Sequence, residues 1–310
     1  MTEIVVSEFM EQAAVARLCV EFDVLYEPKL VDTPEQLRRS VGTASALIVR
    51  NRTAVDADLL AAAPRLEVVG RLGVGVDNID LETCKQRNIG VLPATGANAT
   101  AVAEYVIAGA LMLLRGAYFA SAAVAGGQWP RERLLGREVT GKTIGLVGFG
   151  TISREVARRA GALGMEATAY DPYVDPADTA WRSLGVTQSS LDELIARADI
   201  VSLHVPLNAE TRNLIDAKRF AAMKANAALI NSGRGGLVDE SALAAALYDG
   251  QIGAAMLDVF ATEPLASNSV LAGVPNLIMT PHIAGITVES NRRVSDVTVE
   301  NVIQYLRARR

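Results

Sequence analysis

Short apolar runs rich in β-branched residues alternate with longer amphipathic, alanine-rich segments along the whole chain. Continuous apolar runs of four or five residues are typical of strands buried on both faces, and parallel strands need a crossover segment between them, usually a helix. The alternation therefore predicts an α/β protein whose parallel sheets are covered by helices on both faces. No repeat of fixed period and no low-complexity linker interrupts the pattern.

The apolar runs fall into two series, which suits a chain of 310 residues at roughly 100–200 residues per domain. The first series predicts strands at Ile4–Ser7, Ala46–Val49, Glu67–Gly70 and Gly90–Leu92, with helices at Ala57–Ala63 and at Asp80–Arg87, the latter capped by Asn78 or Asp80. The second predicts strands at Thr143–Val147, Glu166–Tyr170, Ile200–His204, Ala228–Asn231, Ala254–Asp258 and Leu277–Thr280. Its helices are predicted at Ile152–Leu163, Leu191–Ala196, Glu240–Tyr248 and, at the end of the chain, Val288–Arg310. The two series meet near Asn98.

Between the two series lies an apolar stretch, Ala99–Val124, which begins after Asn98 and ends before Gly126. Its length predicts one long helix or two stacked ones. Apolar residues occupy nearly every side of it, which is typical either of a core helix or of a helix shared with a second subunit. The sequence leaves both interpretations open.

The charge and composition exclude several classes of protein. The net charge is −5 and no basic stripe is present, so a nucleic-acid partner is not expected. The amino terminus lacks a secretory signal, and the most apolar stretch, Tyr105 to Leu114, is far shorter than the roughly 20 residues that cross a bilayer. Two cysteines are too few for a disulfide framework. We therefore expect a cytoplasmic protein that is not bound to a membrane.

One glycine motif, Gly136–Thr143, fits the phosphate-loop pattern of nucleoside triphosphatases. That loop binds phosphates only when it follows a strand and opens a helix, because free N–H groups at the helix start hold the anion. Here a polar segment precedes the motif and the apolar run Ile144–Val147 follows it directly. We therefore interpret it as a turn that leads into a strand.

A second glycine loop, Gly148–Ser153, has the context that a dinucleotide site requires. It follows one predicted strand and opens the predicted helix Ile152–Leu163. Gly148 permits the tight turn, and Gly150 allows the backbone to approach a pyrophosphate at the helix start. The third glycine of the usual pattern is replaced by Ser153, which is small enough to pack between helix and strand.

An acidic residue, Asp171, follows the next predicted strand, 23 positions after Gly148 (171 − 148). A carboxylate there can hydrogen-bond the ribose hydroxyls and repels a 2′-phosphate. No arginine follows at once in Asp171-Pro172-Tyr173. The sequence therefore favours NAD over NADP.

Three further residues follow strands of the second series: Arg234, Glu263 and His282. Ligands of open α/β sheets bind at this carboxyl edge. Reduction of a 2-oxo acid needs a cation for the carboxylate and a proton donor for the developing alkoxide, which arginine and a glutamate-oriented histidine supply. The other histidine, His204, ends a strand and is interpreted as structural. A metal site is disfavoured because no histidine or cysteine pair has ligand spacing.

These motifs together resemble the D-isomer-specific 2-hydroxyacid dehydrogenase family, and among its members the short 3-phosphoglycerate and (S)-3-sulfolactate dehydrogenases. The resemblance covers nearly the whole chain. The stretches that carry it are Gly70–Asp80, the Gly148 loop, Asn231–Asp239, Leu257–Pro264 and Pro281–Gly285.

The resemblance implies two Rossmann-like doubly wound domains, with an NAD domain (98–285) inserted into a discontinuous substrate domain (1–97 plus 286–310). It implies Arg234 as substrate anchor, Glu263 as the partner of the histidine and His282 as acid/base. It further implies a homodimer formed through the region around Ala99–Val124. It also implies that the backbone around Val74 and Gly75 holds the substrate carboxylate. The cofactor contacts that it implies are Gly148, Gly150, Thr151, Ile152, Asp171, Val205, Pro206, Ser232, Asp258 (to the nicotinamide amide) and Gly285.

The segment Val49–Thr53 resembles a substrate-binding segment of the family but contains an additional arginine, Arg52. We hypothesise that Arg50, with or without Arg52, faces a second acidic group on the substrate, as in 3-phosphoglycerate or 3-sulfolactate. A merely solvated Arg52 is an equally good interpretation. The chain stops at Arg310 without the regulatory domain of many phosphoglycerate dehydrogenases, so we expect no feedback control by serine.

Three alternatives stay open at this point. Formate dehydrogenases share the fold but pair the histidine with glutamine. Glu263 therefore argues against a formate dehydrogenase. A glyoxylate or hydroxypyruvate reductase would use the same residues on a smaller acid. A non-catalytic NAD-sensing protein, like the co-repressors built on this fold, can retain them as well, and turnover of a 2-oxo acid distinguishes it from an enzyme.

Overall fold

The computed structural model describes residues 2–309, and the side chains of all of these except 117 and 118. The chain forms two compact units, one made of the residues up to Asn98 together with those from Ile286 onward, the other of Ala99–Gly285. Asn98, which the sequence analysis assigned to the second domain, belongs to the first unit. The two outermost residues of the predicted substrate domain, 1 and 310, lie outside the described residues.

The first unit is a parallel five-stranded sheet of order β2-β1-β3-β4-β5. Its strands are β1 (Ile4–Val6), β2 (Val24–Tyr26), β3 (Ala46–Val49), β4 (Val68–Arg71) and β5 (Gly90–Pro93). Its helices are α1 (Gln12–Leu18), α2 (Pro34–Ser40), α3 (Ala57–Ala61), α4 (Leu81–Gln86) and α12 (Val288–Arg307), with 3₁₀ turns at Leu30–Asp32 and Val41–Thr43.

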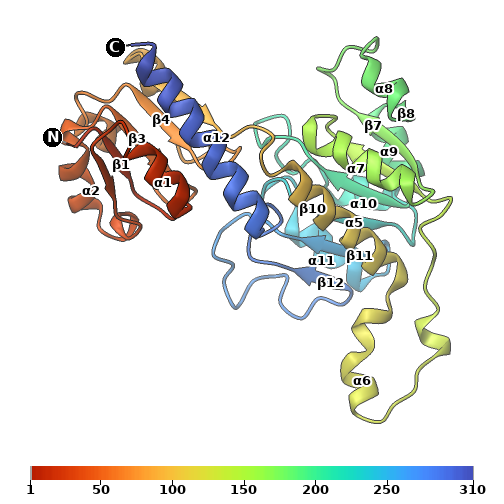
Figure 1. Cartoon of the computed structure of the whole chain (residues 1–310). Coiled ribbons are helices and arrows are strands. Elements are labelled where there is room, and N and C mark those ends of the chain that lie inside the picture. Colours follow the sequence, from red (N-terminus) through yellow and green to blue (C-terminus); the bar gives the residue numbers. More distant parts are fainter. Residues whose placement is uncertain (1, 310) are drawn as a thin grey trace. The chain divides into compact units, whose positions relative to one another are not determined.

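Helices cover both faces of this sheet because alternate strand residues point to opposite sides. In β3, Ala46 and Ile48 pack into the core formed with α1 and α12, whereas Leu47 and Val49 pack against α2, α3 and α4. Helix α12, shown in blue in Figure 1, comes from the far end of the sequence and lies against β4 and β5. It approaches so closely that a Cβ at Gly70 would stand 2.7 Å from Val302 Cγ2.

The second unit is a parallel seven-stranded sheet of order β12-β11-β10-β9-β6-β7-β8. Its strands are β6 (Thr143–Val147), β7 (Glu166–Tyr170), β8 (Val186–Gln188), β9 (Ile200–Leu203), β10 (Ala228–Asn231), β11 (Ala254–Leu257) and β12 (Leu277–Met279). Its helices are α5 (Ala99–Arg115), α6 (Ser121–Ala125), α7 (Thr151–Ala162), α8 (Thr179–Ser183), α9 (Leu191–Arg197), α10 (Ala217–Ala222) and α11 (Glu240–Tyr248), with 3₁₀ turns at Ala117–Ala120 and Glu132–Leu134. Both units thus have the predicted α/β class with parallel sheets.

The predicted strands are all present, and four of them have the predicted bounds: β3, β6, β7 and β10. The sequence analysis missed the short elements β2, β8, α1, α2, α8 and α10. Strands β2 and β8 are three-residue strands at the outer edges of the two sheets. An edge strand has a neighbour on one side only, so it lacks the continuous apolar run by which central strands are recognised. The cap of α4 is Asp80, whose carboxylate accepts from Thr83 N.

The apolar stretch after Asn98 is divided at Gly116, whose left-handed conformation (φ 64°) ends α5. Helix α5 is a core helix of the second unit, and it packs so closely on the sheet that a Cβ at Gly109 would lie 2.6 Å from Met256 Sδ. The continuation through α6 has no buried residue and extends away from the rest of this unit (Figure 1). We call residues 116–136 the arm.

The arm returns to the unit through the segment that resembles a phosphate loop. Gly136 passes so close to the end of α5 that a Cβ there would meet Arg115 O at 2.1 Å, and Arg137 N donates to Leu114 O at 2.8 Å. The segment then enters β6 directly, with no helix after it. Its interpretation as a turn is confirmed. Within residues 2–309, no helix is long and apolar enough to cross a membrane.

Candidate active site

The loops that follow β6 and β7 lie at the carboxyl ends of the parallel strands of the seven-stranded sheet. We call this part of the carboxyl edge the glycine-loop edge. Gly148 has φ 94°, and a Cβ there would lie 2.9 Å from His204 O, so only glycine fits the turn. Ser153, at the third glycine position, is fully buried, and its hydroxyl donates to Gly148 O at 2.6 Å. Serine therefore closes the loop with a hydrogen bond in place of the usual glycine.

The start of α7 lies at this edge and has the features of an anion site. Gly150 is its N-cap, and no side chain caps the helix. A Cβ at Gly150 would meet nothing within 4 Å, so the space beside this residue is open. The first N–H groups of a helix attract a negative charge. The predicted contacts Gly150, Thr151 and Ile152 all belong to this turn and fit the pyrophosphate of a dinucleotide.

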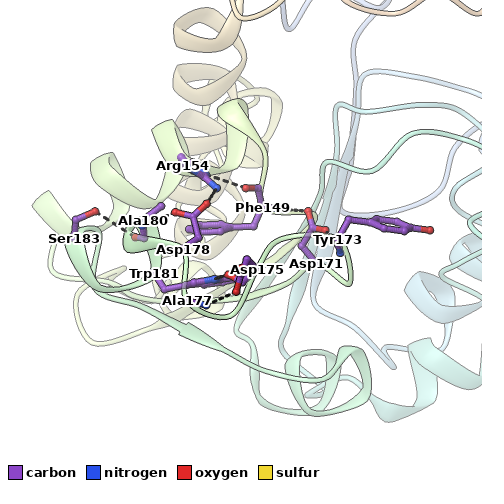
Figure 2. Close-up of polar contacts among 10 residues, drawn as sticks. All are labelled: Phe149, Arg154, Asp171, Tyr173, Asp175, Ala177, Asp178, Ala180, Trp181 and Ser183. Carbon is purple, nitrogen blue, oxygen red and sulfur yellow. Dashed lines mark hydrogen bonds and ion pairs between the residues drawn. The ribbon is translucent and has the colours of Figure 1, made fainter.

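Asp171 follows β7, and both of its carboxylate oxygens accept backbone hydrogen bonds. Oδ2 accepts from Phe149 N at 2.8 Å and Oδ1 from Tyr173 N at 2.9 Å (Figure 2). The acid is therefore fixed directly beside the glycine loop, with lone pairs remaining on both oxygens. This geometry suits a carboxylate that receives the hydroxyls of a ribose.

A cation, Arg154, also lies beside the glycine loop, but it is occupied. Its Nη2 lies 2.7 Å from Asp178 Oδ2, its Nε donates to Phe149 O at 3.1 Å, and its guanidinium covers the Phe149 ring at 5.2 Å (Figure 2). Trp181 stacks on the same ring with 4.1 Å between centroids. A backbone hydrogen bond from Ala180 and the contact with Arg154 lower the pKa of Asp178. Asp178 therefore stays ionised and keeps Arg154 paired.

The loops that follow the adjacent strands β10, β11 and β12 form what we call the histidine edge. They carry Arg234, Glu263 and His282 in that order. The first two loops touch, since a Cβ at Gly235 would lie 1.7 Å from Phe260 O. The second and third are joined because Glu263 Oε2 lies 2.8 Å from His282 Nδ1. The structure thus brings the three predicted residues into one set of connected loops.

Among the described residues, the His282 imidazole is hydrogen-bonded through one nitrogen, by Glu263. Glu263 binds Nδ1, while its other oxygen, Oε1, accepts from Phe260 N at 3.0 Å and so fixes the carboxylate itself. The His282 side chain is 40% exposed, and engagement of Nδ1 leaves Nε2 to act on a ligand. A histidine with one nitrogen oriented by a carboxylate and the other directed to a ligand is the arrangement of a general acid/base. Among residues 2–309 no group of three or more His, Cys, Asp and Glu side chains could hold a metal.

Arg234 lies in a loop that a buried amide shapes. Asn231, 1% exposed, donates from Nδ2 to Arg234 O at 2.9 Å and accepts at Oδ1 from Gly233 N at 3.1 Å. The guanidinium Nη1 donates to Gly233 O at 2.7 Å. Sequence reasoning did not single out Asn231, although an asparagine at the end of a buried strand is a signal, since it must find partners there.

Asp258 is fully buried, and its carboxylate organises the loop of His282. Oδ1 accepts from the Thr280 hydroxyl at 2.6 Å and from Ile283 N at 2.8 Å, and Oδ2 accepts from Ala284 N at 2.7 Å. The resemblance assigned Asp258 to the nicotinamide amide. In this structure the Asp258 carboxylate already accepts hydrogen bonds from the protein backbone. One lone pair of Oδ2 remains for a ligand.

Four other predicted cofactor contacts lie at the same sheet edge. Val205 and Pro206 follow β9, between the two edges, and Gly285 follows the His282 loop. Ser232 follows β10, and its Oγ is buried without a hydrogen-bond partner within the described chain. A buried orphan hydroxyl has unused hydrogen-bonding capacity that a bound group can satisfy. His204 Nε2 lies 2.9 Å from Ser202 Oγ, which agrees with the structural interpretation, and burial lowers its pKa to about 4.

The remaining predicted residues belong to the first unit, at the carboxyl edge of the five-stranded sheet. Arg50 follows β3, and Val74 and Gly75 follow the adjacent β4. Arg50 Nη2 donates to Asn291 Oδ1 at 2.6 Å, so the guanidinium is held by a neutral amide. Burial lowers the pKa of Arg50, against the opposing effect of Glu8, but arginine stays charged at any working pH.

The loop from Arg50 to Thr53 is wrapped around one buried carboxylate, that of Glu8. Glu8 is 4% exposed and accepts from the backbone nitrogens of Arg50 (2.8 Å), Arg52 (3.2 Å) and Thr53 (3.0 Å). Asn78, one of the two caps considered for α4, instead donates to Arg50 O and Thr53 O. The sequence analysis missed both roles because these residues lie far from the loop in sequence.

Arg52 has a partner of its own. It forms a salt bridge with Asp32, and the two side chains are 61% and 52% exposed. The second arginine of the segment is thus paired at the surface, whereas the Arg50 guanidinium has no salt bridge among the described residues, although the nearby Glu8 carboxylate opposes the lowering of its pKa.

Comparison with known proteins agrees with this geometry. The family D-isomer specific 2-hydroxyacid dehydrogenase, NAD binding domain, matches residues 107–284. An (S)-sulfolactate dehydrogenase of Chromohalobacter salexigens is 53% identical over 309 residues, which is 100% of both chains. This chain belongs to the D-isomer-specific 2-hydroxyacid dehydrogenases. It is therefore an enzyme that interconverts hydroxy acids and oxo acids with a nicotinamide cofactor.

Two further proteins that resemble this chain are named for other acids. A D-3-phosphoglycerate dehydrogenase of Mycobacterium bovis is 43% identical over 278 residues, which are 89% of this chain and 52% of that protein. The chain thus spans about half the length of that relative. A solved NADPH-dependent glyoxylate/hydroxypyruvate reductase of Sinorhizobium meliloti superposes with a TM-score of 0.83 at 29% identity, over 99% of this chain and 95% of the other. Proteins similar to this chain are thus named for different acids, and one of them is named as NADPH-dependent.

Proposed function

We propose that the protein is an NAD-dependent dehydrogenase for a 2-hydroxy acid that carries a second, singly charged acidic group, with (S)-3-sulfolactate as the substrate that fits best. The observation that carries the chemistry is the His282–Glu263 pair at 2.8 Å, on loops that adjoin the loop of Arg234. The (S) label agrees with a D-specific family. Sulfur outranks the carboxyl oxygens in the naming rules, so (S)-sulfolactate has the spatial arrangement of D-lactate.

In the reductive direction each side chain has one task. The Arg234 guanidinium pairs with the substrate carboxylate through two parallel hydrogen bonds. His282, protonated, donates the proton on Nε2 to the carbonyl oxygen as that oxygen becomes an alkoxide, and Glu263 stabilises the imidazolium through Nδ1. The hydride would come from a reduced nicotinamide held by the glycine loop and the start of α7. In the oxidative direction His282 takes the hydroxyl proton instead.

The charge of the Arg50 loop supports a sulfonate over a phosphate. Arg52 forms a salt bridge with Asp32 and the Glu8 carboxylate binds the backbone of the loop, so Arg50 is the one arginine of the segment for which the described residues show no salt bridge. A sulfonate carries one negative charge at neutral pH, whereas a phosphate monoester carries nearly two. One guanidinium matches the sulfonate, and the 53% identical relative is named for the same acid.

The cofactor edge supports NAD over NADP. Asp171 lies beside the glycine loop, where its charge would repel a 2′-phosphate, and the ion pair with Asp178 occupies Arg154, the cation nearby. Ser232, with its unused buried hydroxyl, and the uncapped start of α7 complete the set of groups that fit the cofactor. The unit Ala99–Gly285 is accordingly proposed as the NAD domain and the other as the substrate domain.

The arm supports a homodimer. Its large apolar side chains Phe119, Val124, Trp129 and Leu135 are 44%, 46%, 76% and 85% exposed. Several large apolar side chains exposed on one protruding segment are typical of a protein–protein interface. Sedimentation of the purified chain and of a Trp129→Lys, Leu135→Lys variant tests this, because loss of the dimer is expected in the variant. A wild-type chain that sediments as a monomer would contradict the proposal.

The free cysteines, exposed Cys19 and buried Cys84, fit the predicted reducing cytoplasm.

A substrate comparison tests the proposed reaction. The purified chain is given NAD with (S)-3-sulfolactate, 3-phosphoglycerate, glycerate and lactate in turn, and NADH formation is followed by absorbance. We expect kcat/KM for sulfolactate to exceed that for lactate by about a hundredfold, the effect of one desolvated charge pair. Arg50→Gln should remove this preference and Arg52→Gln should keep it. Equal kcat/KM values for lactate and sulfolactate would contradict recognition of a second acidic group. NADH binding without turnover of any acid would favour an NAD sensor.

A further inference from the structure

A chain of hydrogen bonds connects the core helix α5 with the loop of His282. Tyr105, on α5, has its Oη 2.5 Å from Thr280 Oγ1, and Thr280 Oγ1 lies 2.6 Å from Asp258 Oδ1. An ionised carboxylate only accepts, so Thr280 donates to Asp258, and the proton between the two hydroxyls comes from Tyr105. The order of donation is therefore Tyr105 to Thr280 to Asp258.

At its far end this chain holds the backbone around His282. Asp258 accepts from Ile283 N and Ala284 N through its carboxylate and from His282 N through its main-chain oxygen, at 2.7 to 2.8 Å. His282 itself has φ 57°, the left-handed conformation that a residue with a side chain rarely adopts. Such a conformation persists only where the surrounding contacts impose it. Here those contacts are the bonds to Asp258 together with the bond from His282 N to Thr280 O at 3.0 Å.

We propose that Tyr105 is a positioning residue for the acid/base histidine, acting through Thr280 and Asp258 to hold His282 in the left-handed conformation that aligns its imidazole with Glu263. The inference rests on the proposed role of His282, and it adds a residue 175 positions away from Thr280 in the sequence. Tyr105 does not touch the reacting atoms in this account. Its hydroxyl donates a hydrogen bond to the Thr280 hydroxyl.

The environment of Tyr105 suits a fixed donor. Burial, opposed by the hydrogen bond with Thr280, raises its pKa to about 12. The phenol therefore keeps its proton throughout the working range of the enzyme, and the direction of the hydrogen-bond chain does not change with pH. The groups that face it are the Thr280 hydroxyl and the Asp258 carboxylate beyond.

Four variants of the full chain test the proposal. Tyr105→Phe removes one hydroxyl and keeps the ring, Thr280→Val removes the middle hydroxyl, and Thr280→Ser retains it. Tyr248→Phe is the matched control, because Tyr248 is an exposed tyrosine of the same unit. We expect kcat to fall about fivefold in Tyr105→Phe and about tenfold or more in Thr280→Val, each with KM for the acid within about twofold, since a hydrogen bond to these groups is worth that much. Thr280→Ser should restore most of kcat, and Tyr248→Phe should have no effect.

Two further measurements separate positioning from general stability. The double variant Tyr105→Phe, Thr280→Val should be no slower than Thr280→Val alone, since both act through one chain of contacts. Amide hydrogen exchange at residues 282–284 should accelerate in both single variants and stay unchanged in Tyr248→Phe, whether or not the enzyme turns over. An unchanged kcat in Tyr105→Phe, additive losses, or unchanged exchange would overturn the inference. Full activity in a His282→Asn variant would instead remove the proposed function on which it rests.

Discussion

The glycine-loop edge and the histidine edge, two parts of the carboxyl edge of the seven-stranded sheet, are built in different ways. At the glycine-loop edge one continuous stretch supplies strand, turn and helix start, and Asp171 completes it through a bond to Phe149. At the histidine edge three separate loops are joined by the Gly235 approach to Phe260 and the Glu263–His282 pair. The first edge depends on local backbone geometry, the second on contacts between loops.

This difference predicts different responses to substitution. A change at the glycine-loop edge should alter cofactor affinity and leave the reacting groups in place. A change at the histidine edge should spread through the connected loops and reduce turnover. Three substitutions, from the largest expected effect to the smallest, test whether the two edges are separable in this way.

The largest effect is expected from His282→Asn. Removal of the general acid/base should lower kcat by about a thousandfold, within the usual range for such a group, while the dissociation constant for NADH changes little. Steady-state kinetics and fluorescence titration with NADH measure the two quantities. Glu263→Gln is the companion variant, expected to lower kcat less because the imidazole remains. A His282→Asn enzyme that binds NADH much more weakly would show that the edges are coupled.

A smaller effect is expected from Arg234→Gln. Loss of the guanidinium should lower kcat/KM for the acid by about a hundredfold, mainly through KM, because an anchoring charge pair is removed while the proton donor stays. The matched control is Arg197→Gln, a substitution in α9 of the same unit, which should have no effect. If KM for the acid is unchanged in Arg234→Gln, this arginine does not hold the substrate.

The smallest of the three effects is expected from Asp171→Asn. The KM for NADH should rise about tenfold, and the preference for NADH over NADPH should narrow, because the charge that repels a 2′-phosphate is gone. Adding Asp178→Asn should narrow the preference for NADH over NADPH further, because Arg154 is released from its ion pair. Initial rates with both cofactors at one fixed acid concentration give the ratio. An unaltered ratio in the double variant would place the ribose elsewhere.

The sequence alone was a good guide to the central strands and to the glycine-loop edge. The bounds of β6 and β7, the turn at Gly148 and the acid at 171 follow from a continuous pattern, and the false phosphate loop was recognised from its wrong context. It was a poorer guide where the structural cause lies far away in the chain. The edge strands β2 and β8 carry little pattern, and the role of Glu8 in shaping the Arg50 loop depends on contacts more than 40 residues apart.

The sequence by itself determined that the chain forms parallel α/β sheets and which residues lie at their carboxyl edges, because burial on both faces and strand-to-helix turns leave local marks in the residue pattern. Only the tertiary structure decided which of those residues are held and by what. The Asn231 amide, the Glu8 carboxylate and the Tyr105–Thr280–Asp258 chain become visible when distant segments meet. The physical reason is that a buried polar group must find partners, and the fold selects them by proximity in space, which sequence spacing does not record.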